Sequence, residues 1–255
     1  MKFVIFRKRL LMVAVVVILS GVMLTFNMYG TALASVYFGN VPRLVPIYRV
    51  DTTEKKVAIS FDTAWGAEKT SKIIEILNNY KVKATFFLVG FWVDEYPDKV
   101  IELNKAGIEI GTHSNTHPDF ANLSQEDMKL ELETSINKIN SVIDTKIDLF
   151  RLPYGSYNNE VMEVVNSTGL KTIQWDVDTL DWKGLSGLEI CERVLDKVQC
   201  GSIILCHNNS DHILEALPLM LERLLNAGYT VTSVGNLLLH ENYYIDNFGV
   251  QRKNI

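Results

Sequence analysis

The stretch VAISFDTAWG, residues 57–66, joins a short apolar run to an acidic residue, Asp62, and then to a glycine. Apolar runs of this length that end in polar residues are typical of buried strands in a parallel sheet. Further short apolar runs follow along the chain, each separated from the next by a longer stretch. We expect strands at 57–61, 84–89, 109–112, 149–152, 172–177, 202–206 and 230–234.

The stretches between these runs have the apolar spacing of amphipathic helices. We expect helices at 69–80, 97–106, 124–143, 158–167, 188–199 and 213–227. Ser124 followed by Asp127 suits a helix N-cap, and the glycines that follow three of the helices suit left-handed C-terminal caps. These glycines are Gly107, Gly169 and Gly228. Strands that alternate with helices predict an α/β fold with a mostly parallel sheet, and seven such strands suit a closed or nearly closed barrel.

The first 34 residues differ in composition from the rest of the chain. Four basic residues and no acidic residue precede an uncharged run at 10–26. This order predicts a signal peptide or a membrane anchor. Small residues at Ala32 and Ala34 favour cleavage, whereas the length of the apolar run favours retention, and both alternatives stay open. In either case the body of the chain is exported, so we expect an extracytoplasmic location.

The body after residue 34 carries 21 basic and 30 acidic residues, a formal net charge of -9. Nucleic acid is an unexpected partner for such a body, because binding to phosphates requires clustered Lys and Arg. We divide the chain into the export segment at 1–34, a spacer at 35–54, one domain at 55–240 and a polar tail at 241–255. The three cysteines form no C-x-x-C pair and predict neither a disulfide framework nor a thiolate site.

Polar side chains lie at the ends of the expected strands. The carboxyl ends of parallel strands meet on one face of an α/β barrel, where catalytic groups are mounted. The chain therefore delivers several polar groups to one rim. They are Asp62, His113, Arg151, Asp178, Asp181 and His207.

The segment HSNTHP, residues 113–118, places His113 and His117 four residues apart. Two histidines at this spacing can face one side of a helical turn and bind one metal ion. The alternative is a pair of loop histidines bonded to backbone groups. Asp62 can act as a general base beside a metal-bound water, although a single Asp after a strand is often a turn residue.

The segments RLPYG (151–155), DTLDWKG (178–184) and LCH (205–207) hold further candidates. Arg151 can clamp a carboxylate, and Asp181 is a candidate partner, in a functional or a purely structural ion pair. His207 can act as a general acid. Trp182 can floor a sugar site or belong to the core, whereas Trp175, inside an expected strand, is predicted to belong to the core. Asn208 and Asn209 are read as turn residues.

These segments, in this order, resemble the polysaccharide deacetylase family, the NodB homology domain of carbohydrate esterases. The resemblance covers 55–240, and HSNTHP and RLPYG are its most specific motifs. It implies a distorted (β/α) barrel of about seven parallel strands. The implied reaction is metal-assisted hydrolysis of N-acetyl groups on the sugars of a glycan such as peptidoglycan or chitin.

The resemblance also implies roles for individual residues. Asp62 matches the catalytic base and His207 the general acid, while His113 and His117 match ligands of a divalent metal, expected to be zinc. Arg151 and Asp181 match the pair that orients and tunes the base, and the Tyr154 N–H matches an oxyanion donor. The residues expected to contact substrate are Pro153, Trp182 and Leu205.

One position departs from the family pattern. The family commonly has a second Asp after the base, as third metal ligand, where this chain has Thr63. A hydroxyl binds a divalent cation far more weakly than a carboxylate, so weak metal binding is expected. Two hypotheses follow: a deacetylase of GlcNAc or MurNAc, and a catalytically weak or inactive glycan-binding member of the fold. The form SFD-x-x-WG resembles the sporulation-associated branch, whose members have an N-terminal membrane segment and act at the spore or vegetative cell wall.

Overall fold

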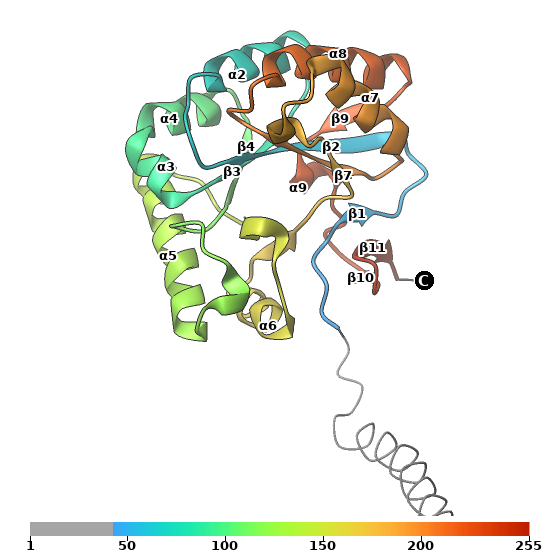
Figure 1. Cartoon of the computed structure of the whole chain (residues 1–255). Coiled ribbons are helices and arrows are strands. Elements are labelled where there is room, and N and C mark those ends of the chain that lie inside the picture. The colour runs from blue at the N-terminus through green and yellow to red at the C-terminus, as the bar shows by residue number, and fades with distance from the viewer. Residues whose placement is uncertain (1–42, 255) are drawn as a thin grey trace, which may run out of the picture. The chain divides into compact units, whose positions relative to one another are not determined.

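The computed structural model describes residues 43–254, and their largest element is a curled parallel sheet (Figure 1). Seven strands lie in the order β6-β5-β4-β3-β2-β8-β7, and β9 pairs with β2 beside this path. The expected α/β fold with about seven parallel strands is confirmed, but the sheet is a curled half-barrel with β6 and β7 at its edges, and the expected closed or nearly closed barrel is wrong. The strands are β2 (Lys56–Thr63), β3 (Thr85–Leu88), β4 (Glu109–Thr112), β5 (Leu149–Arg151), β6 (Lys171–Ile173), β7 (Val177–Asp178), β8 (Ile203–His207) and β9 (Thr230–Thr232).

Helices cover the outer face of this sheet (Figure 1). They are α2 (Thr70–Asn79), α3 (Gly90–Glu95), α4 (Pro97–Lys105), α5 (Gln125–Val142), α6 (Asn159–Ser167), α7 (Gly187–Lys197) and α8 (Ile213–Asn226), and a short helix α9 (Val234–Leu237) follows β9. The predicted cap is confirmed, because the Ser124 hydroxyl accepts a hydrogen bond from the Asp127 N–H. Gly107, Gly169 and Gly228 all have positive φ, as expected of C-terminal caps. The sequence did not indicate α3 or α9.

The single strand expected at 172–177 is wrong. The structure splits it into β6 at one edge of the sheet and β7 at the other, and residues 174–176 cross between the two edges. The crossing exchanges backbone partners, since the Gln174 N–H donates to Ile47 while the Asp176 N–H donates to Ile203. One short stretch of sequence therefore supplies two strands that do not pair with each other.

The open side of the half-barrel is narrowed by the chain just before β2. Ile47 bridges to Ile173 in β6, and Arg49 bridges to Ser202 next to β8. Ile47 and Val50 join an inner apolar cluster with Phe87 and with residues of α9, while a larger cluster fills the space between sheet and helices. The inside of the barrel is consequently a packed core.

The residues expected to be a spacer and a featureless tail contribute a second, three-stranded sheet. Its strands are β1 (Arg49–Val50), β10 (Tyr243–Ile245) and β11 (Val250–Lys253), in the order β1-β11-β10. β1 pairs in parallel with β11, so the two ends of the described chain are joined. The expectation of a featureless polar tail is therefore wrong, because Tyr243–Ile245 and Val250–Lys253 form this hairpin.

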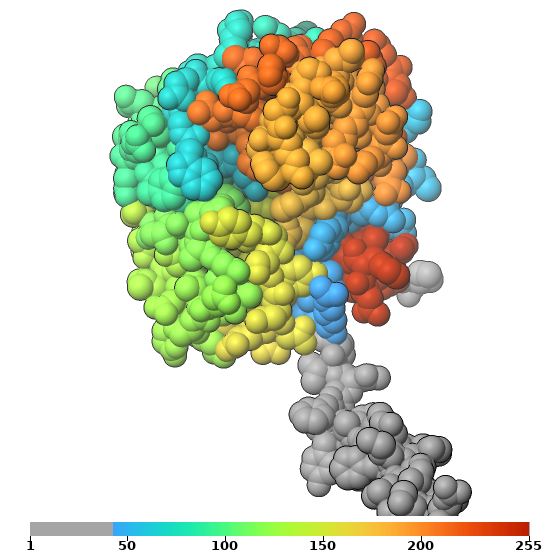
Figure 2. Space-filling view, viewed as in Figure 1, coloured from blue at the N-terminus to red at the C-terminus, as the bar shows by residue number. Residues whose placement is uncertain are grey.

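The predicted export segment at 1–34 lies outside the described residues. Within residues 43–254, no helix has both the length and the apolar character needed to cross a bilayer. In the space-filling view, segments from the first, middle and last thirds of the described chain meet on one face (Figure 2).

Candidate active site

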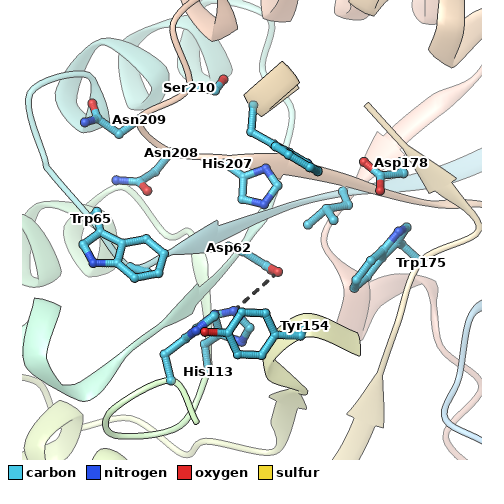
Figure 3. A pocket seen from close by; sticks show the side chains of 14 residues that line it. Asp62, Trp65, His113, Tyr154, Trp175, Asp178, His207, Asn208, Asn209 and Ser210 are labelled. Carbon is cyan, nitrogen blue, oxygen red and sulfur yellow. Dashed lines mark ion pairs between the residues drawn. The ribbon is translucent and has the colours of Figure 1, made fainter. Parts of the chain in front are cut away.

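A pocket of about 680 Å³ lies at the carboxyl ends of the strands (Figure 3). Seven of the residues predicted from the sequence line it: Asp62, His113, His117, Tyr154, Trp182, Leu205 and His207. Asp62 and His207 end neighbouring strands and are register partners of β2 and β8. Register partners on parallel strands lie side by side and point to the same face, so both side chains enter the pocket together.

Asp62 is held by Arg151. The Arg151 Nη1 donates to Asp62 Oδ1 at 3.0 Å, and its Nη2 donates to the Ser60 hydroxyl at 2.9 Å. The predicted pairing of Arg151 with Asp181 is therefore wrong. Arg151 projects from β5 across the barrel interior toward β2, where the nearest carboxylate is that of Asp62.

Arg151 lies behind the pocket wall and is fully buried. Its guanidinium carbon lies 4.4 Å from the ring centroid of Phe87 and 5.2 Å from that of Trp175. Burial lowers the pKa of Arg151, and the charge of Asp62 opposes this shift. An arginine keeps its proton in proteins, so a fixed positive charge holds one oxygen of Asp62 in place.

Asp181 holds His207 instead. Its carboxylate accepts from His207 Nδ1 at 2.7 Å, from the His207 backbone N–H at 2.8 Å and from the Ser210 hydroxyl at 2.9 Å. Burial would lower the pKa of His207, but the hydrogen bond and charge of Asp181 outweigh it and raise that pKa. Asp181 is thus a positioning group behind the imidazole, and its predicted role in tuning the base is not supported by its contacts.

His113 and His117 face each other, with ring centroids 4.8 Å apart. They lie in a loop after β4, so the expected helical turn is wrong. Left-handed backbone at Ser114 and His117 brings the rings together. Glu131 of α5 fixes this loop, because its carboxylate accepts from the Asn115 N–H, the Thr116 N–H and the Thr116 hydroxyl.

Both imidazoles are neutral near pH 7. Burial lowers the pKa of His113, and burial together with the neighbouring His113 lowers the pKa of His117 to about 4. His113 Nδ1 donates to the Arg151 carbonyl at 2.8 Å, which leaves Nε2 with its lone pair, 3.6 Å from Asp62 Oδ2. That distance is too long for a hydrogen bond, and the dashed line in Figure 3 joins these two atoms as an ion pair that exists only when His113 is protonated.

A short 3-10 turn, Pro153–Gly155, carries Tyr154 to the pocket. Tyr154 has a φ of 59°, an unfavourable value for a residue with a side chain, and such backbone clusters at functional sites. Pro153 is buried and does not line the pocket, so its predicted contact with substrate is not supported. It begins the turn. Leu205 and Trp182 lie in the wall, as expected.

Comparison with known proteins agrees with this geometry. The family model described as polysaccharide deacetylase matches residues 49–173. A peptidoglycan-N-acetylglucosamine deacetylase of Bacillus cereus is 30% identical over 200 residues, which cover 76% of this chain and 93% of that protein. The chain belongs to the polysaccharide deacetylase family.

Other members of the polysaccharide deacetylase family are also similar. The uncharacterized protein YlxY of Bacillus subtilis is 33% identical over 76% of this chain, and the chain spans 60% of the length of YlxY. A CE4 family pseudoenzyme from Bacillus anthracis has a TM-score of 0.73 and 36% identity, over 76% of this chain and 68% of that one. A mutant of that pseudoenzyme has restored enzymatic activity, and it matches with the same TM-score and 37% identity.

The residues present fit only part of the metal site that the deacetylase family implies. The orphaned, buried His117 Nδ1 and the free Nε2 of His113 suit two zinc bonds. Thr63, however, is fully buried, does not line the pocket and directs its hydroxyl to the Phe61 carbonyl. Within the described residues, no group of three or more His, Cys, Asp or Glu side chains is placed to hold a metal. Residues 43–254 therefore offer no third protein ligand beside the two histidines.

The structure adds pocket residues that the sequence analysis passed over. Asp178 was noted at a strand end but given no role, and its carboxylate lines the wall. Trp175 also lines the wall, where the crossing between β6 and β7 brings it, and it packs against the inner apolar cluster, so its assignment to the core is only part of its role. Trp65 stands in the quoted SFDTAWG motif, three residues after Asp62. That short distance from a catalytic candidate was the available signal.

Proposed function

We propose that this domain hydrolyses N-acetyl groups of amino sugars in an exported glycan, with GlcNAc or MurNAc of peptidoglycan as the substrate class and chitin-like oligomers as a second class. One observation carries the proposal: Asp62 and His207 enter one pocket from neighbouring strands, and each is held by its own buried partner. A base and an acid are the two groups that amide hydrolysis requires. The Bacillus cereus relative, a peptidoglycan-N-acetylglucosamine deacetylase, supports the substrate class.

In the proposed reaction, Asp62 takes a proton from the attacking water, and the oxygen of that water bonds to the acetyl carbon. The Tyr154 N–H donates to the resulting oxyanion. His207 gives a proton to the departing amine, so that the C–N bond breaks and acetate and a free amino sugar leave. Zinc held by His113 and His117 would supply Lewis acidity toward the acetyl carbonyl.

Product analysis tests this proposal directly. The purified chain is incubated with acetylated peptidoglycan and chitin oligomers and with several divalent metals, and products are identified by mass. We expect a loss of one acetyl group per reacted sugar, and we expect His207→Ala to abolish it. Acetate release that persists unchanged in His207→Ala would refute the assigned acid.

A second candidate function is glycan binding with weak or absent catalysis. Thr63 favours it, and so does the likeness to the Bacillus anthracis pseudoenzyme. The presence of both Asp62 and His207 argues against a pure glycan-binding function, because a binding protein needs neither a base nor an acid. Glycan binding without any turnover at saturating metal would establish this alternative and exclude the first.

The predicted export segment at 1–34 favours a location outside the cytoplasm, either secreted to the cell wall or spore envelope or held at the membrane by that segment. Wall-active relatives are consistent with this location. The resemblance to the sporulation-associated branch suggests a role in spore formation.

A further inference from the structure

Exposed aromatic rings are concentrated at the pocket. Of the four tryptophans in the chain, Trp65 and Trp182 are 65% and 62% exposed, and both line the pocket together with the exposed ring of Tyr154. Exposing a whole indole to water forfeits the free energy that burial of its surface would give. Trp182 and Tyr154 are already explained by the proposed acetyl site and oxyanion turn. Trp65 is not used by any step of the reaction.

The backbone beneath Trp65 is firmly anchored. The Gly66 carbonyl accepts two hydrogen bonds at 2.8 Å, from Trp92 Nε1 of α3 and from Asn208 Nδ2 after β8. Gly66 has a φ of 66°, and a side chain there would collide with the amide of Asn209. A turn that is fixed by hydrogen bonds therefore holds the indole in its exposed position. A loose loop is not the reason for its exposure.

Trp65 lies at the margin of the site. Its ring centroid is 5.3 Å from that of His117 in an edge arrangement and 6.1 Å from that of Phe91. In Figure 3, Trp65 and Trp175 flank Asp62 and His207 from opposite sides, and the amides of Asn208 and Asn209 lie near Trp65. The pocket of about 680 Å³ exceeds the volume of one sugar ring.

We infer that Trp65 forms a separate sugar-binding subsite, which stacks against the sugar next to the one that loses its acetyl group. A pyranose has an apolar C–H face that suits an exposed indole and polar edges that suit neighbouring amides. The protein then selects oligosaccharides over monosaccharides. This inference rests on the proposed function only in taking an N-acetylated glycan as the ligand.

The test compares binding of chitotetraose and of N-acetylglucosamine to the full chain in detergent micelles, by calorimetry and by tryptophan fluorescence. We expect Trp65→Ala to weaken tetramer binding by about tenfold, as an aromatic stacking contact suggests. Binding of the monosaccharide should change by less than about twofold. Trp65→Phe should retain most of the tetramer affinity. Phe248→Ala is the matched control, because Phe248 is 84% exposed in the turn between β10 and β11 and does not line the pocket.

Unchanged tetramer binding in Trp65→Ala would overturn the inference, and so would an equal loss for the two ligands, which would indicate a supporting role for His117. Absence of any glycan binding by the parent chain would overturn it as well. Circular dichroism and thermal unfolding verify that each variant is folded. Acetate release is measured separately, so that a chain that binds through Trp65 but releases no acetate refutes the deacetylase and leaves the subsite standing.

Discussion

Replacing Arg151 with methionine should destabilise the domain because it leaves the carboxylate of Asp62 buried without its partner. The side chain of Arg151 is fully buried, and that of Asp62 is nearly so, at 9% exposure. Breaking such a pair costs about 3–5 kcal/mol. For a domain of this size, roughly 2–4 °C of Tm is lost per kcal/mol, so Tm should fall by roughly 6–20 °C. Methionine keeps much of the aliphatic length of the side chain and removes the guanidinium group that lies over Phe87 and Trp175.

The same reasoning predicts that the double variant Arg151→Met/Asp62→Asn recovers most of this loss, because neither charge then remains. Urea unfolding of the parent, the two single variants and the double variant gives the interaction free energy, expected to be about 3 kcal/mol. The matched control is the cycle on Arg252 and Asp246, a more exposed pair at 2.8 Å in the β10–β11 hairpin, which should give less than about 1 kcal/mol. If the losses of unfolding free energy in the two single variants simply add in the double variant, the ion pair between Arg151 and Asp62 is not the cause of the destabilisation.

Three further predictions concern the two histidine sites. The raised pKa of His207 means that its pair with Asp181 stabilises the fold at low pH and that this contribution is lost as pH rises through the raised pKa. Asp181→Asn should therefore lower the free energy of unfolding more at pH 5 than at pH 9. It should also move the high-pH limb of the pH profile of acetate release to lower pH. An unmoved limb would contradict the role of the His207–Asp181 pair. Thr63→Asp should raise zinc affinity by at least about tenfold in calorimetric titration, whereas an unchanged titration would mean that position 63 does not reach the metal. Glu131→Ala should lower zinc affinity by about tenfold, because the loop of His117 loses three hydrogen bonds, and Glu131→Gln should lose less; equal affinities in all three proteins would show that the loop needs no such support.

The sequence was informative about which residues reach the rim and less so about their partners. Residues such as Asp62 and His207 could be placed because each directly follows an apolar run, and parallel strands align such ends. Pairing could not be deduced in the same way. Asp62 and Asp181 were both expected on the same rim as Arg151, and only the curl of the sheet, which carries the Arg151 side chain from β5 to Asp62 in β2, decides between them.

Local periodicity also misled at two places. The run at 172–177 has uniform strand character, yet its two ends belong to opposite edges of the sheet, and only the backbone partners of Gln174 and Asp176 reveal the change. The spacing of His113 and His117 suggested a helical turn, whereas left-handed residues in a loop produce the same proximity. Left-handed backbone at a residue with a side chain leaves no clear signal in one sequence.

The bridges made by Ile47 and Arg49 have a consequence for where this domain begins. Ile47 bridges to β6 at one edge of the sheet, and Arg49 bridges to Ser202, just before β8. This short segment therefore links the two sides of the half-barrel across its open side. Arg49 and Val50 also pair with β11, the final strand of the described chain. A domain truncated to start at Lys55, where the motif-bearing region starts, would lose both bridges across the open side of the half-barrel. It would also lose the pairing of β1 with the β10–β11 hairpin. The compact unit of the structure accordingly begins at Leu44.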